Sequence, residues 1–312
     1  MSGAVRARAG LAVLAAWGAI ALAAPLLPLR DPNAQPDGLV LRTLPPMSRV
    51  DALVATDGSV RYAHELRRDP DGGLSFRRGE TWTKVSEPGV TPARALFVLG
   101  TDSYGRDLLS RLVWGARVSL VAGLLAALVA VVIGGSVGLV AGLAGGRVDA
   151  ILMRATDAAL AIPRLFLLLL LAALFRPSLA TTVVLVGATT WMAAARLVHG
   201  EVLSVRERDF VAAARAAGAS PVRLGLRHVL PHAAAVLGVE ASLRLGQAVL
   251  LEASLSFLGL GVPPPAASWG GLIADGRDRL LDAWWIATWP GIALAGVVIA
   301  ASLVADGARR RI

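Results

Sequence analysis

Long apolar runs separated by polar, arginine-containing stretches dominate this chain of 312 residues. About 20 apolar residues in helical conformation are needed to cross the hydrocarbon core of a bilayer, and several runs reach that length. The pattern predicts six membrane-spanning helices, over 10–29, 118–146, 151–175, 178–195, 233–255 and 283–305. The second and sixth runs contain no charged residue, whereas the third and the fifth contain three each.

Two interpretations fit the first run, which lies between Arg8 and Arg30. A cleaved signal peptide has a shorter apolar core and ends at small residues such as A-x-A. The stretch 25–30 contains no site of that kind. We therefore expect residues 1–30 to form a retained N-terminal membrane helix.

Arginines near the ends of the runs predict the orientation, because short loops rich in basic residues stay in the cytoplasm. Arg6 and Arg8 precede the first run, and Arg147 and Arg154 lie around the start of the third. Six arginines follow the fourth run: Arg196, Arg206, Arg208, Arg215, Arg223 and Arg227. The tail 307–312 carries three more, Arg309 to Arg311. We expect both termini inside and the segment 31–115 outside.

The outer segment, 31–115, lacks long apolar runs. Turn signals at Asp57-Gly58, Asp71-Gly72-Gly73 and Arg78-Gly79 separate short polar and apolar stretches, which predicts small β-hairpins. A segment of this size buries little core of its own. We therefore expect it to lean on the membrane domain or on a partner.

Composition fits the membrane pattern: 55% of the residues are hydrophobic and 17% charged, and the mean hydropathy is +0.64. Soluble domains carry about 25% charged residues, so disorder is excluded and a water-soluble globule is disfavoured. The 31 basic residues outnumber the 22 acidic ones. They lie between apolar runs, which favours membrane topology over nucleic-acid binding. The absence of cysteine excludes disulfides and thiolate sites.

Small residues recur at every fourth position of the second run: Ala122, Ala126, Ala130, Gly134, Gly138, Gly142 and Gly146. This spacing lets a neighbouring membrane helix approach closely. Four residues turn 400°, so the stripe drifts by about 40° per step. We expect it to contact more than one neighbour or a partner crossing at an angle. Ordinary packing and a moving interface both remain open.

Charged residues in the fifth run form a candidate polar site. Glu240 and Arg244 are spaced i, i+4 with the acid first, the favoured order for a helical pair. Charges at membrane depth face a bundle interior or a water-filled path. A neutral pair that holds helices together and a pathway contact both fit. Asp157 and Arg164 are expected closer to the inner surface, where they can reach the headgroups.

Short motifs that are typical of enzymes occur in this chain, but their surroundings do not fit a catalytic site. Lys84, the only lysine, lies in the outer segment, so a phosphate-binding loop is excluded. The G-x-S-x-G match at 134–138 lies inside a predicted span, with no histidine in any span. His228 and His232 have a zinc-like spacing, but Pro231 lies between them and no third ligand is evident. We predict no catalytic, cofactor-binding or metal site in this chain.

The loop after the fourth run predicts two short helices. Residues 207–217 are good helix formers and end at Gly218, a favoured helix stop. Ser220 as N-cap and Pro221 in the first turn begin a second helix, which is expected to end near His228, before Leu230-Pro231. Phe210, Val211 and Leu224 are available for packing. DNA binding is disfavoured because membrane helices hold both ends, so docking of a cytoplasmic protein is the alternative.

This loop resembles the "EAA" loop of binding-protein-dependent ABC transporter permeases. The family pattern is E-A-A, three residues, Gly, nine residues, I, one residue, L-P. In this chain, 212–218 and Leu230-Pro231 have that spacing. Ala212 stands in place of the glutamate and His228 in place of the isoleucine. The departures weaken any role for a charge at position 212 but leave the shape of the loop intact.

Two further stretches resemble the dipeptide, oligopeptide and nickel permeases of this family. One is the Gly-Thr-Asp motif at 100–102, with Gly105-Arg106-Asp107 and 115–120. The other is 255–262 with Ser268-Trp269-Gly270. Residues about 50–95 are similar to an insertion between the first span and the Gly-Thr-Asp motif.

The resemblance implies an all-α, type I ABC importer permease of about six membrane helices in a bacterial inner membrane. Residues 116–306 would form its five-helix permease domain and 199–232 its cytoplasmic coupling loop. The implied partners are a second permease, two cytoplasmic ATPases that bind ATP, an extracytoplasmic binding protein and lipid, but no nucleic acid. The implied coupling residues are Phe210, Ala212, Ala213, Ala214, Arg215, Gly218, Leu230 and Pro231.

Several functions remain open at this point. Peptides are the first expectation for the substrate, and nickel or another small solute is the alternative. A secondary carrier that needs no ATPase is a second alternative. A membrane structural protein, an exporter and a membrane enzyme fit the sequence less well.

Overall fold

The structure, a computed structural model, describes residues 3–70, 73–86 and 89–309. Parts of two sequence predictions, the turn at Asp71-Gly72 and the tail arginines Arg310 and Arg311, lie outside this range. The chain divides into two compact units. One consists of Met1–Ala19, Val118–Pro263 and Leu294–Ile312, and the other of Ile20–Arg117 and Pro264–Ala293.

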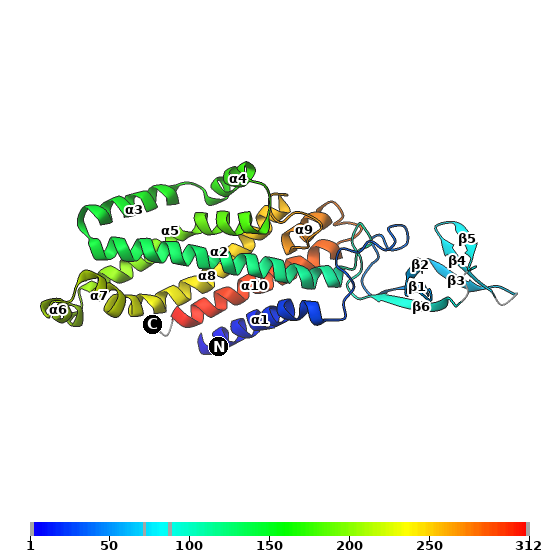
Figure 1. The fold of residues 1–312 in the computed structure, drawn as a ribbon, viewed down its shortest axis with the longest axis horizontal. Helices are drawn as coiled ribbons and strands as arrows, with labels where there is room; N and C mark the ends of the chain where they lie inside the picture. Colours follow the sequence, from blue (N-terminus) through cyan, green and yellow to red (C-terminus); the bar gives the residue numbers. More distant parts are fainter. Residues whose placement is uncertain (1–2, 71–72, 87–88, 310–312) are drawn as a thin grey trace. The chain divides into compact units, whose positions relative to one another are not determined.

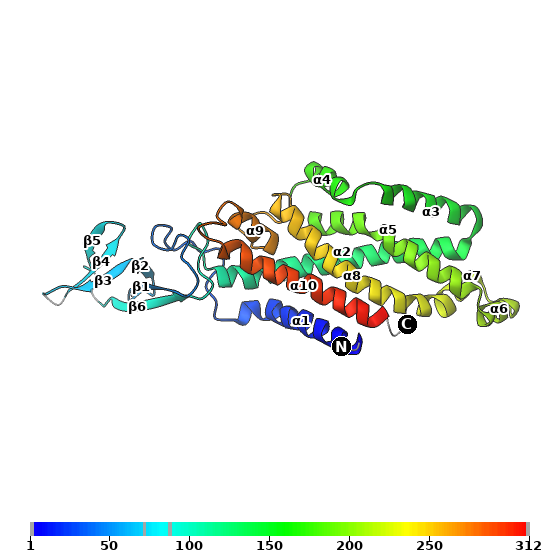
Figure 2. The ribbon, with the colours of Figure 1, turned by 180° about the vertical axis from the view of Figure 1, so that it is seen from behind.

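The first unit is helical. It contains α3 (Gly146–Ala161), α4 (Arg164–Leu174), α5 (Leu179–Arg206), α6 (Asp209–Ala216), α7 (Pro221–Leu224), the π-turn η2 (Gly225–Val229) and α8 (Leu230–Phe257). It also includes most of α2 (Leu108–Ala144) and parts of α1 (Gly3–Ala23) and α10 (Trp285–Arg309). Helix α5 packs against α3, α4 and α8. Figures 1 and 2 show α6 and α7 toward the end of this unit at which α1 begins and α10 ends.

Among the residues that the structure describes, four helices are long and apolar enough to cross a membrane: α1, α2, α5 and α10. The pair α3 and α4 together meets the same criteria as one bent span. Helix α8, which corresponds to the fifth predicted run, is long enough at 28 residues but is not among these candidates, so the described residues give four or five spans where the sequence predicted six. The helical membrane fold expected from the sequence is therefore confirmed.

The third predicted run is not one straight helix, which corrects the sequence-based expectation. Helix α3 ends at Ala161, α4 begins at Arg164, and the two are bent by 87°. Pro163 explains the break, because proline disfavours the helical conformation of the residue before it. Ile162 is accordingly extended, with φ −78° and ψ 127°. The prediction of a single span was wrong because hydropathy alone does not detect this break.

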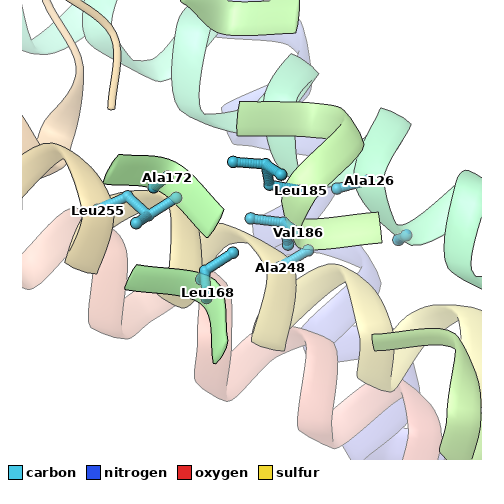
Figure 3. Packing of buried hydrophobic residues seen from close by; sticks show 8 residues of the cluster. Ala126, Leu168, Ala172, Leu185, Val186, Ala248 and Leu255 are labelled. Atoms are coloured by element: carbon cyan, nitrogen blue, oxygen red, sulfur yellow. The ribbon is translucent and has the colours of Figure 1, made fainter. Parts of the chain in front are cut away.

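A core of apolar side chains joins four helices of this unit. Figure 3 shows side chains of α4, α5 and α8 converging on one another and on α2. The buried members are Ala126, Ala127, Leu168, Ala172, Leu185, Val186, Ala248 and Leu255. Leu168 and Leu255 are fully buried, so the short helix α4 is held against α5 and α8 despite the break before it.

The predicted stripe of small residues lies against α5 along its glycine-rich half. A Cβ atom on Gly134 would clash with the carbonyl oxygen of Trp191, and one on Gly138 with that of Ala195. At Gly142 it would lie 2.5 Å from Cγ1 of Val202. All three partners belong to α5. The second neighbour, α8, is reached beside the stripe, where a Cβ on Gly123 would clash with Val249.

Adjacent glycines of α2 provide a matched test of this close approach. A Cβ on Gly135 would lie 3.5 Å from Leu237, an ordinary contact, whereas Gly134 has no room for one. Gly134→Ala should lower the free energy of unfolding by about 1–3 kcal/mol through overpacking. Gly135→Ala should leave it almost unchanged. Thermal unfolding of the purified protein in detergent measures both, and equal stability of the two variants would contradict the packing described.

The second unit contains two three-stranded antiparallel sheets, with strand orders β2-β1-β6 and β3-β4-β5. Their strands are β1 (Ser48–Val54), β2 (Val60–Ala63), β3 (Glu65–Arg68), β4 (Leu74–Arg78), β5 (Thr81–Lys84) and β6 (Thr91–Phe97). The hairpins predicted at Asp57-Gly58 and Arg78-Gly79 are present, joining β1 to β2 and β4 to β5. The pairing of β6 with β1 closes the first sheet. The remaining elements are η1 (Ala24–Leu26) and α9 (Trp269–Arg277).

The first sheet, β2-β1-β6, has a small core of its own within this unit. Val50, Ala52, Tyr62 and Phe97 are buried together with the segment at 40–41. The Tyr62 and Phe97 rings lie 6.1 Å apart. The first sheet therefore packs against the chain that precedes it, and support from the membrane domain or a partner stays a prediction.

A buried ion cluster fixes the Gly-Thr-Asp motif in the same unit. Asp102 is fully buried and accepts a 2.6 Å hydrogen bond from Nε of Arg106, and Nε of Arg111 lies 3.4 Å away. Arg106 also donates to Asp275 of α9 over 3.2 Å. Partial burial raises the pKa of Asp275, against the opposing effect of Arg106 and Arg111. The cluster ties the motif to α9.

Candidate functional site

The most distinctive site of the helical unit is α6, and local sequence explains its bounds. Asp209 in its first turn complements the positive helix N-terminus. The helix ends in a Schellman motif, because the N–H of Ala219 donates to the carbonyl of Ala214 over 3.1 Å. Gly218 adopts the left-handed conformation that this motif needs, with φ 82°. The predicted stop at Gly218 is where the structure places it.

Helix α7 begins as the sequence predicts but continues differently. The hydroxyl of Ser220 accepts a 3.3 Å bond from the N–H of Arg223, which makes Ser220 the N-cap. The chain then passes through η2 directly into α8, so it does not stop before Leu230-Pro231. Pro231 is in the first turn of α8, where its missing N–H leaves no helical bond unmade. This corrects the expected end near His228.

A valine-rich core anchors α6, α7 and η2 to the longer helices. Its buried members are Val198, Val202 and Val205 of α5, Val211 of α6, Leu224 of α7 and Val229 of η2. Leu139 and Leu143 of α2 and Leu237 of α8 pack against it. We call this set the valine core. Close-packed side chains therefore connect α6 with α2, α5 and α8.

The opposite side of α6 faces outward. Phe210, predicted to be available for packing along with Val211, is instead 40% exposed. Neighbouring residues of a helix point about 100° apart, so Val211 alone enters the valine core. Ala212, Ala213 and Gly218 are also exposed. The result is a short anchored helix with an aromatic side chain on its outer surface.

The remaining predicted loop residues fall between the two faces. Ala214 packs at the edge of the valine core, Leu230 is partly buried, and Pro231 is exposed. The backbone of Arg215 is in α6, whereas the side chains of Arg215, His228 and His232 lie outside the described part. Among the described residues, no group of three or more His, Cys, Asp or Glu side chains could hold a metal ion.

Two polar contacts near α6 and α7 were not predicted from the sequence. The Arg206 guanidinium donates to the carbonyl of Gly142, near the C-terminal end of α2, where a positive charge complements the helix dipole. Nε2 of His199 lies 2.7 Å from a carboxylate oxygen of Asp149 on α3. Arg206 and Asp149 are far from these partners in sequence, so no local pattern predicts either contact.

The predicted polar pair of α8 forms a second site. Glu240 and Arg244 are 4% and 7% exposed and make an ion pair. Arg244 also donates to Oε1 of Gln247 over 2.8 Å, and Arg164 of α4 donates to the same oxygen over 3.4 Å. Sequence analysis placed Arg164 near the inner surface and did not include Gln247. Gln247 is three residues from Arg244, so its helical spacing was the missed signal.

Comparison with known proteins shows which proteins this chain is similar to. The family model described as "Binding-protein-dependent transport system inner membrane component" matches residues 134–312. The di/tripeptide transport system permease protein DppC of Pseudomonas aeruginosa is 42% identical over 216 residues, covering 69% of this chain and 71% of that protein. The oligopeptide transport system permease protein OppC of Escherichia coli is 42% identical over 210 residues, 67% of this chain and 70% of the relative.

A solved structure supports the fold. A chain of the MetNI methionine ABC transporter, in inward-facing conformations, superimposes with a TM-score of 0.54 at 20% sequence identity. The match covers 65% of this chain and 97% of the other. The helical unit therefore has the fold of an ABC transporter permease.

Proposed function

The chain belongs to the family of binding-protein-dependent transport system inner membrane components, the permease subunits of ABC importers, and from that premise we propose that it carries di- or oligopeptides. The relatives support this choice, because DppC and OppC are named as permeases of peptide transport systems. The chain would form half of the translocation path, and a second permease would supply the other half.

The orientation completes the proposal. The loop with α6 and α7 would face the cytoplasm, with both termini on that side and the β-strands outside. The placement of α6 toward the end at which α1 begins and α10 ends supports this arrangement. A binding protein would deliver the peptide from outside.

Coupling to ATP is assigned to α6, and one observation carries this assignment. Val211 is buried in the valine core, while Phe210 beside it is exposed. A partner that binds the outer face of α6 and displaces it would therefore move α2, α5 and α8 together. Two cytoplasmic ATPases would dock there and bind the ATP. Their closure on ATP would tilt the helices and open the path outward, then inward.

Reconstitution in proteoliposomes tests the function as a whole. The permease, its partner permease, the ATPases and the binding protein are combined with a labelled tripeptide. We expect the peptide to be taken up only when ATP is present on the side of the membrane where the ATPases are bound. ATP-independent uptake would favour a secondary carrier, and ATP-driven uptake of nickel without peptide would favour the metal-transporting relatives.

The pair Glu240 and Arg244 is proposed to face the interior of the helical unit. Their burial at the middle of α8 supports this placement, because charges at membrane depth face a bundle interior or a path. Gly134, Gly138 and Gly142 would serve as the packing surface that keeps α2 in register with α5.

A further inference from the structure

Four polar side chains of the helical unit meet where the third span is broken. Arg164 is the first residue of α4, directly after the break, and Glu240, Arg244 and Gln247 are on α8. The amide oxygen of Gln247 accepts from Arg244 over 2.8 Å and from Arg164 over 3.4 Å. A single acceptor thus holds two guanidinium groups near one another, and we call these four residues the break cluster.

The break cluster lies at mid-depth of α8. Fourteen residues of α8 precede Arg244 and thirteen follow it, so about 20 Å of helix extends on either side. In the orientation proposed above, with α8 crossing the bilayer, these groups would lie near its midplane. Transporters often place substrate sites at this depth, at the ends of broken helices.

The break cluster has an excess of positive charge. Two guanidinium groups face one carboxylate, and the described residues place no carboxylate within ion-pair distance of Arg164. The start of α4 adds partial positive charge, because its N-cap Pro163 makes no side-chain capping bond. An arginine at a helix N-terminus is unfavourable on electrostatic grounds alone. The excess positive charge of the break cluster and the start of α4 together favour transient binding of an anion.

The four side chains differ in exposure. Glu240 and Arg244 are buried, Arg164 is partly buried and Gln247 is exposed. Arg164 is therefore the charged member that a solute can reach, and the amide oxygen of Gln247 positions it. A guanidinium group binds a carboxylate through two parallel hydrogen bonds, so its geometry selects carboxylates among the groups that a peptide carries.

We propose that Arg164 contacts a carboxylate of the substrate as it passes the middle of the membrane, an inference that rests on the proposed peptide transport. The carboxylate is either the C-terminus of the peptide or the side chain of an acidic residue. Arg164 is thus a specificity-determining residue inside the permease, separate from the selectivity of the binding protein.

Paired substrates test this site in the complete reconstituted transporter. One pair is alanyl-glutamyl-alanine and alanyl-glutaminyl-alanine; the other is trialanine and its C-terminal amide. The uptake ratio within each pair is compared between wild type and Arg164→Gln. Because the binding protein is unchanged, its own preference cancels in that comparison. We expect the ratio to shift against the carboxylate by about tenfold in at least one pair, as loss of one charge-assisted hydrogen bond implies.

Two variants control for structural effects. Arg164→Lys keeps the charge and should keep most of the preference. Arg154→Gln removes an exposed arginine of α3 outside the break cluster and should leave both ratios unchanged. Equal loss of uptake for both members of each pair in Arg164→Gln, or unchanged ratios, would overturn the proposal. If wild type transports none of the four peptides with ATP, the proposed function itself is wrong, and this site falls with it.

Discussion

Gly218→Glu should abolish ATP-driven uptake while the permease still inserts in the membrane. Gly218 closes the Schellman motif of α6 with φ 82°, and a side chain there costs about 1–2 kcal/mol of backbone strain. A Cβ on Gly218 would meet no atom within 4 Å, so the side chain would project from the surface. There it would place a charge at the proposed ATPase contact. We expect a loss of at least about tenfold, the factor that corresponds to 1.4 kcal/mol, and the same for Gly218→Arg.

A matched variant separates backbone strain from loss of the fold. Asparagine tolerates the left-handed conformation better than other residues with a side chain, so Gly218→Asn should retain most of the uptake. Membrane content, measured by immunoblot, should be equal for all three variants. Uptake by Gly218→Glu at the wild-type rate would refute the assignment of α6 as the coupling element.

Breaking the buried pair of α8 should have the largest effect on stability. Glu240→Leu leaves the Arg244 guanidinium buried without its carboxylate, and Arg244→Leu leaves the carboxylate without its cation. Removing one partner of a buried pair costs about 3–5 kcal/mol. The double variant removes both charges and should recover most of this loss. Thermal unfolding in detergent measures all three variants.

The same variants distinguish the two roles that the sequence left open. If the pair holds helices together, the double variant is stable and still transports peptide. If the pair contributes to the path, the double variant is stable but uptake fails. If the Glu240→Leu protein were as stable as the double variant, Arg244 would not be left as an unpaired buried charge by the change. That result would contradict the structure.

Much of α6 and α7 was predictable because their bounds depend on local chemistry. Gly218 ends α6 and Ser220 caps α7 through bonds to residues within a few positions. Hydropathy likewise located the long helices, since crossing a bilayer needs only length and apolarity. It failed at Pro163, where a backbone restriction breaks the helix within a run that hydropathy treats as one segment.

Features that depend on which surfaces meet could not be predicted. Arg164 and Gln247 are 83 positions apart, and their contact follows from the bend after α3. Strand β6 pairs with β1 although four strands lie between them in the sequence. Helical periodicity permitted either Phe210 or Val211 to be buried, and the position of α5 decided between them.

Cysteine labelling of α6 tests the central claim most directly, because the chain has no native cysteine. Ala213→Cys places a thiol on the exposed face of α6, and Ser59→Cys places one in the exposed β1–β2 turn as a control. With a membrane-impermeant maleimide, Ala213→Cys should react only in inside-out vesicles and be protected when the ATPases are bound. Ser59→Cys should react only in right-side-out vesicles. Labelling of Ala213→Cys from the outside, or labelling that bound ATPases do not reduce, would contradict the account.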